Sequence, residues 1–296
     1  MIEDYLKNNN YEYESDASLK KYNTYRIDAR VKYLVFPSSI DELVNLLKEL
    51  KKDNISFLIL GGGSNIIFAK DYYDKVFINL SKLNKISIRG SVLTAGAGAP
   101  MIKVANYAID NNLDGLVFAT GLPGTIGGAS VVNAGCYGSS MSEIVKEVTV
   151  LDENFNIKKY TNKDMKYEYR NSILKNTKNI VLQVKVKLYP GNLEDMKSIR
   201  EERREKRVSS QPLDKPSAGS TFRNPEGALP AGKLIEDAGL KGTKVNDAEV
   251  STKHANFIIN NGNATGKDIL DLIHIVQARI KEVYDIDLHL EQIIID

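Results

Sequence analysis

Residues 121–138 read Gly-Leu-Pro-Gly-Thr-Ile-Gly-Gly-Ala-Ser-Val-Val-Asn-Ala-Gly-Cys-Tyr-Gly, a run that contains six glycines and one proline. So few Cβ atoms leave backbone N–H groups accessible and allow a ligand to approach the main chain closely. Consecutive accessible amides form concave sites that suit an anion such as a diphosphate. Another loop of this kind, Gly61-Gly62-Gly63-Ser64-Asn65, follows an apolar run upstream. Because it comes earlier in the chain, we call it the first glycine loop and call residues 121–138 the second glycine-rich segment. Two such loops favour a large dinucleotide bound along its length.

The alternative interpretation is that these glycines only form turns. The upstream loop is not a P-loop, because no Gly-Lys-Ser/Thr follows it. It is not a Gly-x-Gly-x-x-Gly motif that opens a helix either, so a Rossmann site is disfavoured. The run from Gly121 is longer than a connection needs, and a purely structural role is the less favoured alternative for it.

Composition excludes several classes of protein. The chain has 296 residues, 42% of them hydrophobic and 26% charged, which is ordinary for a globular protein with a sizeable core. The net charge of +2 gives no electrostatic case for nucleic acid. A single cysteine, no apolar stretch of membrane-spanning length and no signal peptide predict a cytoplasmic protein. The three histidines lack the spacing of metal ligands, so no metal is predicted.

Apolar periodicity predicts an α+β chain with many short strands. Helices are expected at 40–51, from Pro100 to about 111, at 232–239, and from a Thr265 cap to about 284. Strands are expected at 55–60, 76–79, 85–88, 91–95, 144–151, 180–188, 256–260 and 286–295.

Residues 193–207 are densely charged with both signs. We predict a solvated connecting helix laced with i,i+4 pairs, in preference to a basic recognition stripe, because glutamates interleave the basic residues. Pro212 and Pro216 follow and mark a plausible domain boundary.

Three further segments carry candidate chemistry. Arg170 follows Tyr169, and its guanidinium fork suits a carboxylate, although a surface arginine packed on tyrosines is an equal alternative. Ser220 lies in a tight segment bounded by prolines, where its hydroxyl could face a ligand or simply serve a turn. It lacks the Gly-x-Ser-x-Gly context of a hydrolase nucleophile. Glu291 lies in an apolar terminal strand, either facing outward, which is commoner, or buried and functional.

Taken in order, these segments resemble the UDP-N-acetylenolpyruvoylglucosamine reductase (MurB) family from about residue 22 to residue 296. The chain is most similar to the compact type II form, which lacks an extra tyrosine-bearing loop. The resemblance is carried by Gly61–Asn65, Gly121–Ala129, Asn133–Gly138, Tyr169–Ser172, Gly219–Pro225, Ala231–Ile235 and Leu290-Glu291.

The resemblance implies an α+β fold with an FAD-binding domain of the vanillyl-alcohol-oxidase (PCMH) type and a smaller α/β substrate-binding domain. Residues 1–208 would form the FAD-binding region, in two subdomains of about 1–80 and 81–208. Residues 209–296 would bind the substrate, with the C-terminal strand returning to the active site. The FAD contacts expected by resemblance are Gly61, Gly62, Gly63, Ser64, Asn65, Gly121, Gly124, Thr125, Gly127, Gly128 and Ala134.

The implied reaction is the NADPH-dependent reduction of UDP-N-acetylglucosamine enolpyruvate to UDP-N-acetylmuramate, a step of peptidoglycan precursor synthesis and hence of cell-wall biogenesis, cell shape and cell division. Hydride would pass through FAD to C3 of the enolpyruvyl group. Arg170 matches the residue that stabilises the developing carboxylate charge, Ser220 the donor of the proton to C2, and Glu291 a third catalytic residue. Tyr169, Asn224 and Lys233 match positions that contact the sugar nucleotide.

Two departures from the family pattern stand out. Many relatives carry Phe-Arg-Ile-Gly-Gly where this chain has Tyr25-Arg26-Ile27-Asp28-Ala29, so the backbone at 28–29 should not need a positive φ. The terminal Pro-Glu-Val of the family becomes Leu290-Glu291-Gln292, which removes a proline and keeps the carboxylate.

No histidine lies near the first glycine loop, and Cys136 is expected to pack, so FAD is predicted to bind without a covalent tether. A monomer is expected, because no long apolar stripe remains unexplained. Two other functions compete with the reductase: a flavin-dependent oxidase of the same superfamily acting on another small substrate, and a nucleotide-binding protein without catalysis. The joint presence of Arg170, Ser220 and Glu291 argues against the second.

Overall fold

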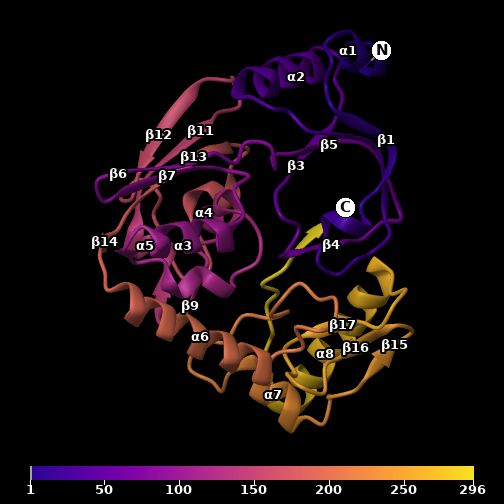
Figure 1. The fold of residues 1–296 in the computed structure, drawn as a ribbon. Helices are drawn as coiled ribbons and strands as arrows, with labels where there is room; N and C mark the ends of the chain where they lie inside the picture. The colour runs from indigo at the N-terminus through magenta and orange to yellow at the C-terminus, as the bar shows by residue number, and fades with distance from the viewer. Residues whose placement is uncertain (1) are drawn as a thin grey trace. The chain divides into compact units, whose positions relative to one another are not determined.

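The computed structural model describes residues 2–296, which divide into two compact units. Unit 1 contains residues up to Ser15, Tyr33–Gly62 and Lys75–Arg204. Unit 2 contains Asp16–Lys32, Gly63–Asp74 and Glu205–Asp296. Each unit therefore combines segments that are far apart in the sequence, and Figure 1 shows their helices and strands.

Unit 1 is built on a five-stranded sheet in the order β12-β11-β13-β7-β6. The register places Val148 opposite Val184, and Val184 opposite Ala95. All three side chains are fully buried, so they line one face of the sheet. The strands are β6 (Ile86–Arg89), β7 (Val92–Gly96), β11 (Val145–Leu151), β12 (Ile157–Thr161) and β13 (Ile180–Lys187).

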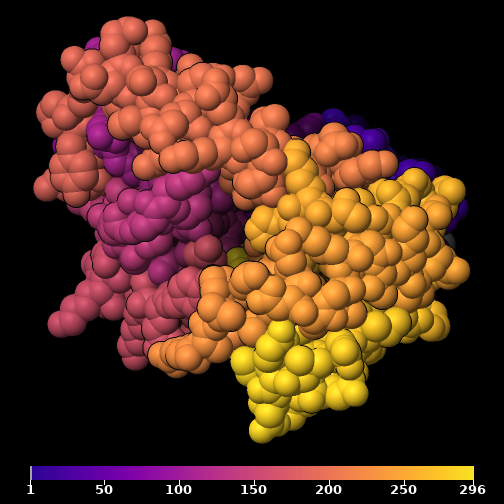
Figure 2. All heavy atoms as spheres, turned by 90° about the horizontal axis from the view of Figure 1, so that it is seen from below, coloured from indigo at the N-terminus to yellow at the C-terminus, as the bar shows by residue number. Residues whose placement is uncertain are grey.

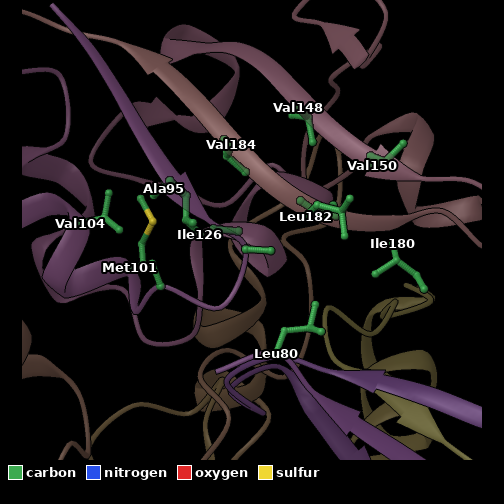
Figure 3. Packing of buried hydrophobic residues seen from close by; sticks show 14 of the residues in the cluster. Leu80, Ala95, Met101, Val104, Ile126, Val148, Val150, Ile180, Leu182 and Val184 are labelled. Carbon is green, nitrogen blue, oxygen red and sulfur yellow. The ribbon is translucent and has the colours of Figure 1, made fainter. Parts of the chain in front are cut away.

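Two helices complete the core of unit 1. They are α3 (Met101–Asp110) and α4 (Ile126–Val131), and α4 contacts β7, β13 and α3. Figure 3 shows side chains of these helices gathered with those of the sheet, including Met101 and Ile126 beside Ala95. The glycine-rich residues 121–138 thus contain a whole helix, α4, which packs on the sheet.

The amphipathic segment near the N-terminus forms α2 (Ile40–Lys52) as predicted. Ser39 caps it by accepting a hydrogen bond from the amide of Glu42, and its leucines are buried. Strand β3 (Phe57–Leu60) follows and pairs in parallel with β5 (Tyr72–Asn79). These strands belong to a four-stranded sheet in the order β1-β2-β5-β3, with β1 at Tyr13–Ser18 and β2 at Arg30–Val35. The C-terminal end of β3 therefore delivers the first glycine loop.

Unit 2 contains the long helix α8 (Gly266–Tyr284), whose predicted Thr265 cap is present as a capping box with Asp268. It contacts the three-stranded sheet β15-β16-β17, which comprises Lys244–Val245, Ala248–Val250 and Ile258–Asn260. Helix α7 (Ala231–Asp237) contacts α8. Strand β18 (Ile293–Ile295) pairs in parallel with β4 (Ile66–Phe68). The C-terminal part of this unit, orange to yellow in Figure 2, forms one continuous mass of atoms.

The charged segment forms α6 (Leu193–Ser210), and Met196 is its one buried residue. Two ion pairs on this helix, Lys197–Glu194 and Arg204–Glu201, are spaced i,i+3. The prediction of a solvated helix is confirmed. The predicted strand at 286–295 is wrong over most of its length, because only the last three of these residues pair with a neighbouring strand.

The remaining elements are short: α1 (Ile2–Asn8), α5 (Met141–Ile144), η1 (Lys20–Tyr22), η2 (Val117–Gly121), η3 (Ile173–Asn176), β8 (Leu113–Asp114), β9 (Gly135–Cys136), β10 (Ser139–Ser140) and β14 (Tyr189–Pro190). No helix within residues 2–296 has the length and apolar character needed to cross a membrane.

Candidate functional site

Within unit 1 the two glycine-rich segments touch each other through their backbones. A Cβ atom added to Gly62 would lie 2.6 Å from the Cα of Gly124, and one added to Gly61 would lie 3.0 Å from the Thr125 hydroxyl oxygen. Side chains are therefore excluded from this contact. The end of β3 and the start of α4 form one joint backbone surface.

The glycines and their neighbours divide between two tasks. Gly127 faces inward: it is buried, its amide donates to the carbonyl of Ala97 at 3.0 Å, and a Cβ there would meet Ala97 at 2.8 Å. By contrast, no acceptor within residues 2–296 receives the backbone amides of Gly62, Gly124 or Thr125. These N–H groups fit a ligand that carries anionic oxygens, such as the diphosphate of FAD.

Arg170 is tied to the second glycine-rich segment. Its Nη2 donates to the carbonyl oxygen of Gly135 at 2.7 Å. Two further bonds hold the flanking chain: Asn133 Nδ2 donates to the carbonyl of Glu168 at 2.8 Å, and Ser172 Oγ donates to that of Val131 at 2.6 Å. The predicted cation is thus fixed against the run predicted to hold the cofactor.

The local geometry of Arg170 is unusual. Its backbone has a φ of +54°, in the left-handed region that non-glycine residues rarely adopt. Its guanidinium lies 5.0 Å from the ring centroid of Tyr169, which is 58% exposed. Strained backbone of this kind persists where surrounding contacts fix it, and such residues gather at functional sites.

The Ser220 segment is held by unit 2. Gly219, with a φ of +76°, turns the chain, and Ser220 then forms an antiparallel bridge with Phe257. The side chain of Asn256 accepts from the amide of Phe222 at 2.9 Å and donates to its carbonyl at 2.8 Å. Ser220 is therefore set on a well-defined backbone, half-buried.

Glu291 lies on the segment beside it. Phe222 bridges Leu290, and the amide of Glu291 donates to the carbonyl of Thr221 at 2.9 Å. Asn65 Nδ2 donates to the carbonyl of Glu291 at 3.1 Å. The structure thus brings the backbones of Ser220 and Glu291 together in unit 2, along with the last residue of the first glycine loop. Arg170 belongs to unit 1.

The other predicted contacts have local partners. Asn224 Oδ1 accepts from the amide of Ala231 at 3.0 Å and so supports the start of α7. Lys233 pairs with Asp237 at 2.6 Å, and this carboxylate raises the pKa of the lysine. Gly121 ends η2, and the amide of Ala134 donates to Ala129 at 2.9 Å. Cys136 Sγ lies 3.0 Å from the carbonyl oxygen of Phe118.

Sequence reasoning missed Asn256 and Gln292, two buried amides that hold the Ser220 segment. The signal available in the sequence was that each of these polar residues lies beside apolar ones. Such a signal indicates that the residue has a special role, but it does not indicate which group the side chain binds. The predicted absence of positive φ at Asp28 and Ala29 is confirmed; Asp28 instead accepts a hydrogen bond from Ser18 at 2.6 Å.

Residues 2–296 contain no cluster of three or more His, Cys, Asp or Glu side chains that could hold a metal ion. Among the histidines, His254 packs on Phe257, and burial lowers its pKa. Its Nδ1 accepts from the amide of Asn256 at 3.2 Å, so this ring is part of the scaffold behind the Ser220 segment.

Comparison with known proteins identifies the family. Residues 31–159 match an FAD-binding domain, and residues 211–295 match the C-terminal domain of UDP-N-acetylenolpyruvoylglucosamine reductase. The UDP-N-acetylenolpyruvoylglucosamine reductase of Caldanaerobacter subterraneus is 46% identical over 270 residues, which cover 91% of this chain and 89% of that protein. The chain belongs to the UDP-N-acetylenolpyruvoylglucosamine reductase family.

Solved structures agree with this MurB membership. The crystal structure of MurB from Thermus caldophilus matches with a TM-score of 0.81 at 29% identity, covering 97% of this chain and 99% of that one. A glucooligosaccharide oxidase from Acremonium strictum matches with a TM-score of 0.50 at 13% identity, covering 98% of this chain and 60% of that one, which shows the fold alone. The predicted family, the α+β fold and its vanillyl-alcohol-oxidase type of FAD-binding domain are confirmed.

Proposed function

We propose that this member of the MurB family reduces UDP-N-acetylglucosamine enolpyruvate to UDP-N-acetylmuramate with electrons from NADPH, using FAD held without a covalent bond. The observation that carries the proposal is the hydrogen bond of 2.7 Å from Arg170 Nη2 to Gly135. It fixes a permanent cation against the glycine-rich run, which is where an anionic transition state beside a flavin needs one.

The residues proposed to hold FAD are those of the two glycine-rich segments. Gly61, Gly62 and Gly124 carry no side chain, and together with the Thr125 amide they offer a backbone surface that suits the diphosphate. Gly63, Ser64, Asn65, Gly121, Gly128 and Ala134 are the further contacts we propose, with Gly127 supporting the segment from inside. When bound, FAD supplies hydride transfer between NADPH and the substrate.

Arg170 is proposed to stabilise charge. Addition of hydride at C3 of the enolpyruvyl group leaves negative charge on C2 and on the adjacent carboxylate. A guanidinium held by Gly135 and stacked on Tyr169 keeps its orientation during this change, so it needs no reorganisation. The planar guanidinium fork suits a bidentate contact with the carboxylate.

Ser220 and Glu291 are proposed to complete the reaction. The hydroxyl of Ser220 delivers a proton to C2, and Glu291 is the third catalytic residue that we propose. A serine hydroxyl is a weak acid, so its position must be accurate. The bonds from the Glu291 amide to the Thr221 carbonyl and from the Phe222 amide to Asn256 Oδ1 provide such a position within unit 2.

We further propose that residues 209–296 bind the sugar nucleotide, with contacts from Asn224 and Lys233, and that Tyr169 contributes from the FAD-binding region, residues 1–208. Lys233 is exposed and charged, as a contact to a diphosphate requires. We propose that the enzyme acts as a monomer in the cytoplasm, in the synthesis of the peptidoglycan precursor. In that role it would support cell shape, cell division and progress through the cell cycle.

A visible absorbance spectrum tests the proposal. The purified chain, loaded with FAD, should show a flavin spectrum that NADPH bleaches and that UDP-N-acetylglucosamine enolpyruvate restores under anaerobic conditions. A protein that binds no FAD contradicts the proposal in favour of a protein without catalysis. Rapid oxygen consumption with an alcohol or sugar, and no response to the enolpyruvyl substrate, contradicts it in favour of an oxidase.

A further inference from the structure

Gln292, the residue after Glu291, is a buried amide at the centre of a small polar cluster in unit 2. Its exposed fraction is 4%. Its Nε2 lies 3.2 Å from the carbonyl oxygen of Ala218, 3.4 Å from that of Gly219 and 3.5 Å from that of Ser220. Its Oε1 accepts a hydrogen bond of 3.0 Å from the Tyr25 hydroxyl. One side chain therefore connects the Ser220 segment with a distant part of the chain.

The partners determine the orientation of this amide. Backbone carbonyls only accept hydrogen bonds, so the NH₂ group must face residues 218–220 and the oxygen must face Tyr25. The Tyr25 hydroxyl must then donate. Tyr25 is fully buried, and desolvation raises its pKa, which keeps the hydroxyl neutral and able to donate. The carbonyl of Tyr25 in turn accepts from Asn260 Nδ2 at 2.9 Å, so the anchor is itself held.

Residues 218–220 need this partner. Three successive carbonyl dipoles point toward one place, and Gly219 adopts a φ of +76° to allow it. Without the Gln292 amide, the buried carbonyl of Ala218 would lose this donor, and an unsatisfied buried oxygen is costly in a protein interior. A shift of the segment to reach other donors would displace Ser220.

Two residues that lie far apart in the sequence, Tyr25 and Gln292, meet in this cluster. Both side chains are buried, and each provides the other with a hydrogen-bond partner. Together they form the 3.0 Å hydrogen bond, and they do so one residue away from Glu291.

We propose that Gln292 is a positioning residue which, anchored by Tyr25, holds the backbone of residues 218–220 and so orients the Ser220 hydroxyl for proton transfer to the substrate. The proposal rests on the role of Ser220 proposed above. The same residue continues the backbone of Glu291, so one segment sets the position of both groups.

The test separates the two half-reactions by stopped-flow absorbance of the FAD-loaded enzyme. Gln292→Met preserves size and removes the donor. It should slow reoxidation of the flavin by the enolpyruvyl substrate about 100-fold, the loss expected of a displaced reacting group, while reduction by NADPH stays within about twofold. Tyr25→Phe removes only the anchoring hydroxyl and should slow reoxidation less, about fivefold to tenfold. This second variant keeps the test open if Gln292→Met does not fold.

Two further variants locate the effect. In a Ser220→Ala background, Gln292→Met should cause no further loss, because both changes disable the same proton donor. Gln277→Met removes a comparable bond in the same unit, from Nε2 to the carbonyl of Leu288 at 2.8 Å, and should lower the thermal midpoint without changing the ratio of the two half-reactions.

The outcomes are distinguishable. Normal reoxidation in both Gln292→Met and Tyr25→Phe, with slow reoxidation in Ser220→Ala, overturns the positioning role and leaves the proposed function intact. Normal reoxidation in Ser220→Ala overturns the role of that serine, and the positioning role with it. An equal loss in both half-reactions, or a loss that adds fully to that of Ser220→Ala, also overturns the positioning role, because Gln292 would then act on the fold or on another group.

Discussion

The side-chain amide nitrogen of Asn65 donates a hydrogen bond of 3.1 Å to the backbone carbonyl of Glu291, 226 residues further along the chain. Asn65 is the last residue of the first glycine loop, and its own carbonyl accepts from the amide of Ile293 at 2.9 Å. The two bonds hold the chain at Glu291 and at Ile293, on either side of Gln292. A loop proposed to bind the cofactor thus also fixes the backbone of a proposed catalytic carboxylate.

Asn65→Ala removes one of these bonds. We expect a loss of about 1 kcal/mol in the free energy of unfolding, the usual contribution of such a hydrogen bond, and a fall in kcat of about tenfold at saturating FAD because Glu291 loses its orientation. Thermal unfolding and steady-state kinetics measure the two effects. Asn261→Ala is the control, since it breaks an exposed bond of 2.7 Å to Glu249 and should leave kcat unchanged. Equal kcat values for the two variants would refute the coupling.

Gly62→Ala introduces a Cβ only 2.6 Å from the Cα of Gly124, where backbone must move to make room. Overpacking of this kind typically costs about 1–3 kcal/mol of stability, and the separated loops should bind FAD at least about tenfold more weakly. Asn261→Ala, which lies outside both glycine-rich segments, is the comparison and should bind FAD like the unmodified protein. Titration of the apoprotein with FAD, followed by flavin fluorescence, gives both affinities. Unchanged affinity in Gly62→Ala would show that the contact between the two loops does not shape the cofactor site.

Arg170→Lys keeps the charge and loses the planar fork that both binds Gly135 and stacks on Tyr169. We expect reoxidation of the flavin by substrate to slow about 100-fold or more, the range found when a preorganised donor is removed, with reduction by NADPH little changed. Tyr169→Phe retains the ring beside the guanidinium and tests whether that ring alone keeps Arg170 in place. If Arg170→Lys turned over normally, charge alone would account for the role of Arg170.

Ser220→Ala deletes the proposed proton donor without disturbing the backbone bridge to Phe257. NADPH should still bleach the flavin, and substrate should restore it about 100-fold to 10,000-fold more slowly, as expected for loss of a general acid. Ser217→Ala, in the same segment, should behave like the unmodified enzyme. Anaerobic stopped-flow absorbance measures both steps, and rapid reoxidation in Ser220→Ala would remove the serine from the mechanism.

Asp152 gives a pH prediction. Its carboxylate accepts from the amides of Asn156 at 2.8 Å and Asn154 at 2.9 Å and pairs with Lys158 at 2.9 Å. These partners, Lys158 above all, lower its pKa to about 2, against about 3.9 in an unfolded chain. The depressed pKa stabilises the fold fully above about pH 4, and this contribution is lost as the pH falls toward 2.

Asp152→Asn removes the titrating group at nearly constant shape. Thermal midpoints measured from pH 6 to pH 2 should lie below those of the unmodified protein at the upper end. The two curves should converge as the pH drops through the window between about 4 and about 2. Curves that stay parallel throughout would exclude a role of this carboxylate in acid sensitivity.

Local signals predicted the helices well. The Thr265 cap with Asp268, and the leucine spacing of α2, are contained in short stretches of sequence, and both helices begin where these signals lie. The last strand was overestimated because Leu288 and Leu290 alternate with polar residues as a strand does. Their backbone makes only the single bridge from Leu290 to Phe222.

Long-range partners could not be predicted. Asn65 looked like a cofactor contact, and nothing in its neighbourhood indicated Glu291. Gly127 is among the FAD contacts expected from the sequence, but its amide donates a hydrogen bond to the carbonyl of Ala97 in the interior of unit 1. In both cases the deciding neighbour comes from a distant segment, and hydrogen-bonding capacity alone does not say which of many acceptors a donor will meet. Residue types and their order were enough to predict the family and the candidate catalytic residues. The residues that hold these groups in place became known only from the three-dimensional contacts.

The parallel pairing of β18 with β4 has a consequence for biosynthesis. A ribosome releases β4 early, and the main-chain groups on that side of it can find their native partners only after Ile293–Ile295 have emerged. Unit 1 meets no such delay, since its own segments are complete by Arg204. Nascent chains that stall after Arg204 has emerged but before Ile293 should therefore contain a protease-resistant unit 1 and an incomplete unit 2 in which one edge of β4 is unpaired. Chaperones shield intermediates of this kind from aggregation.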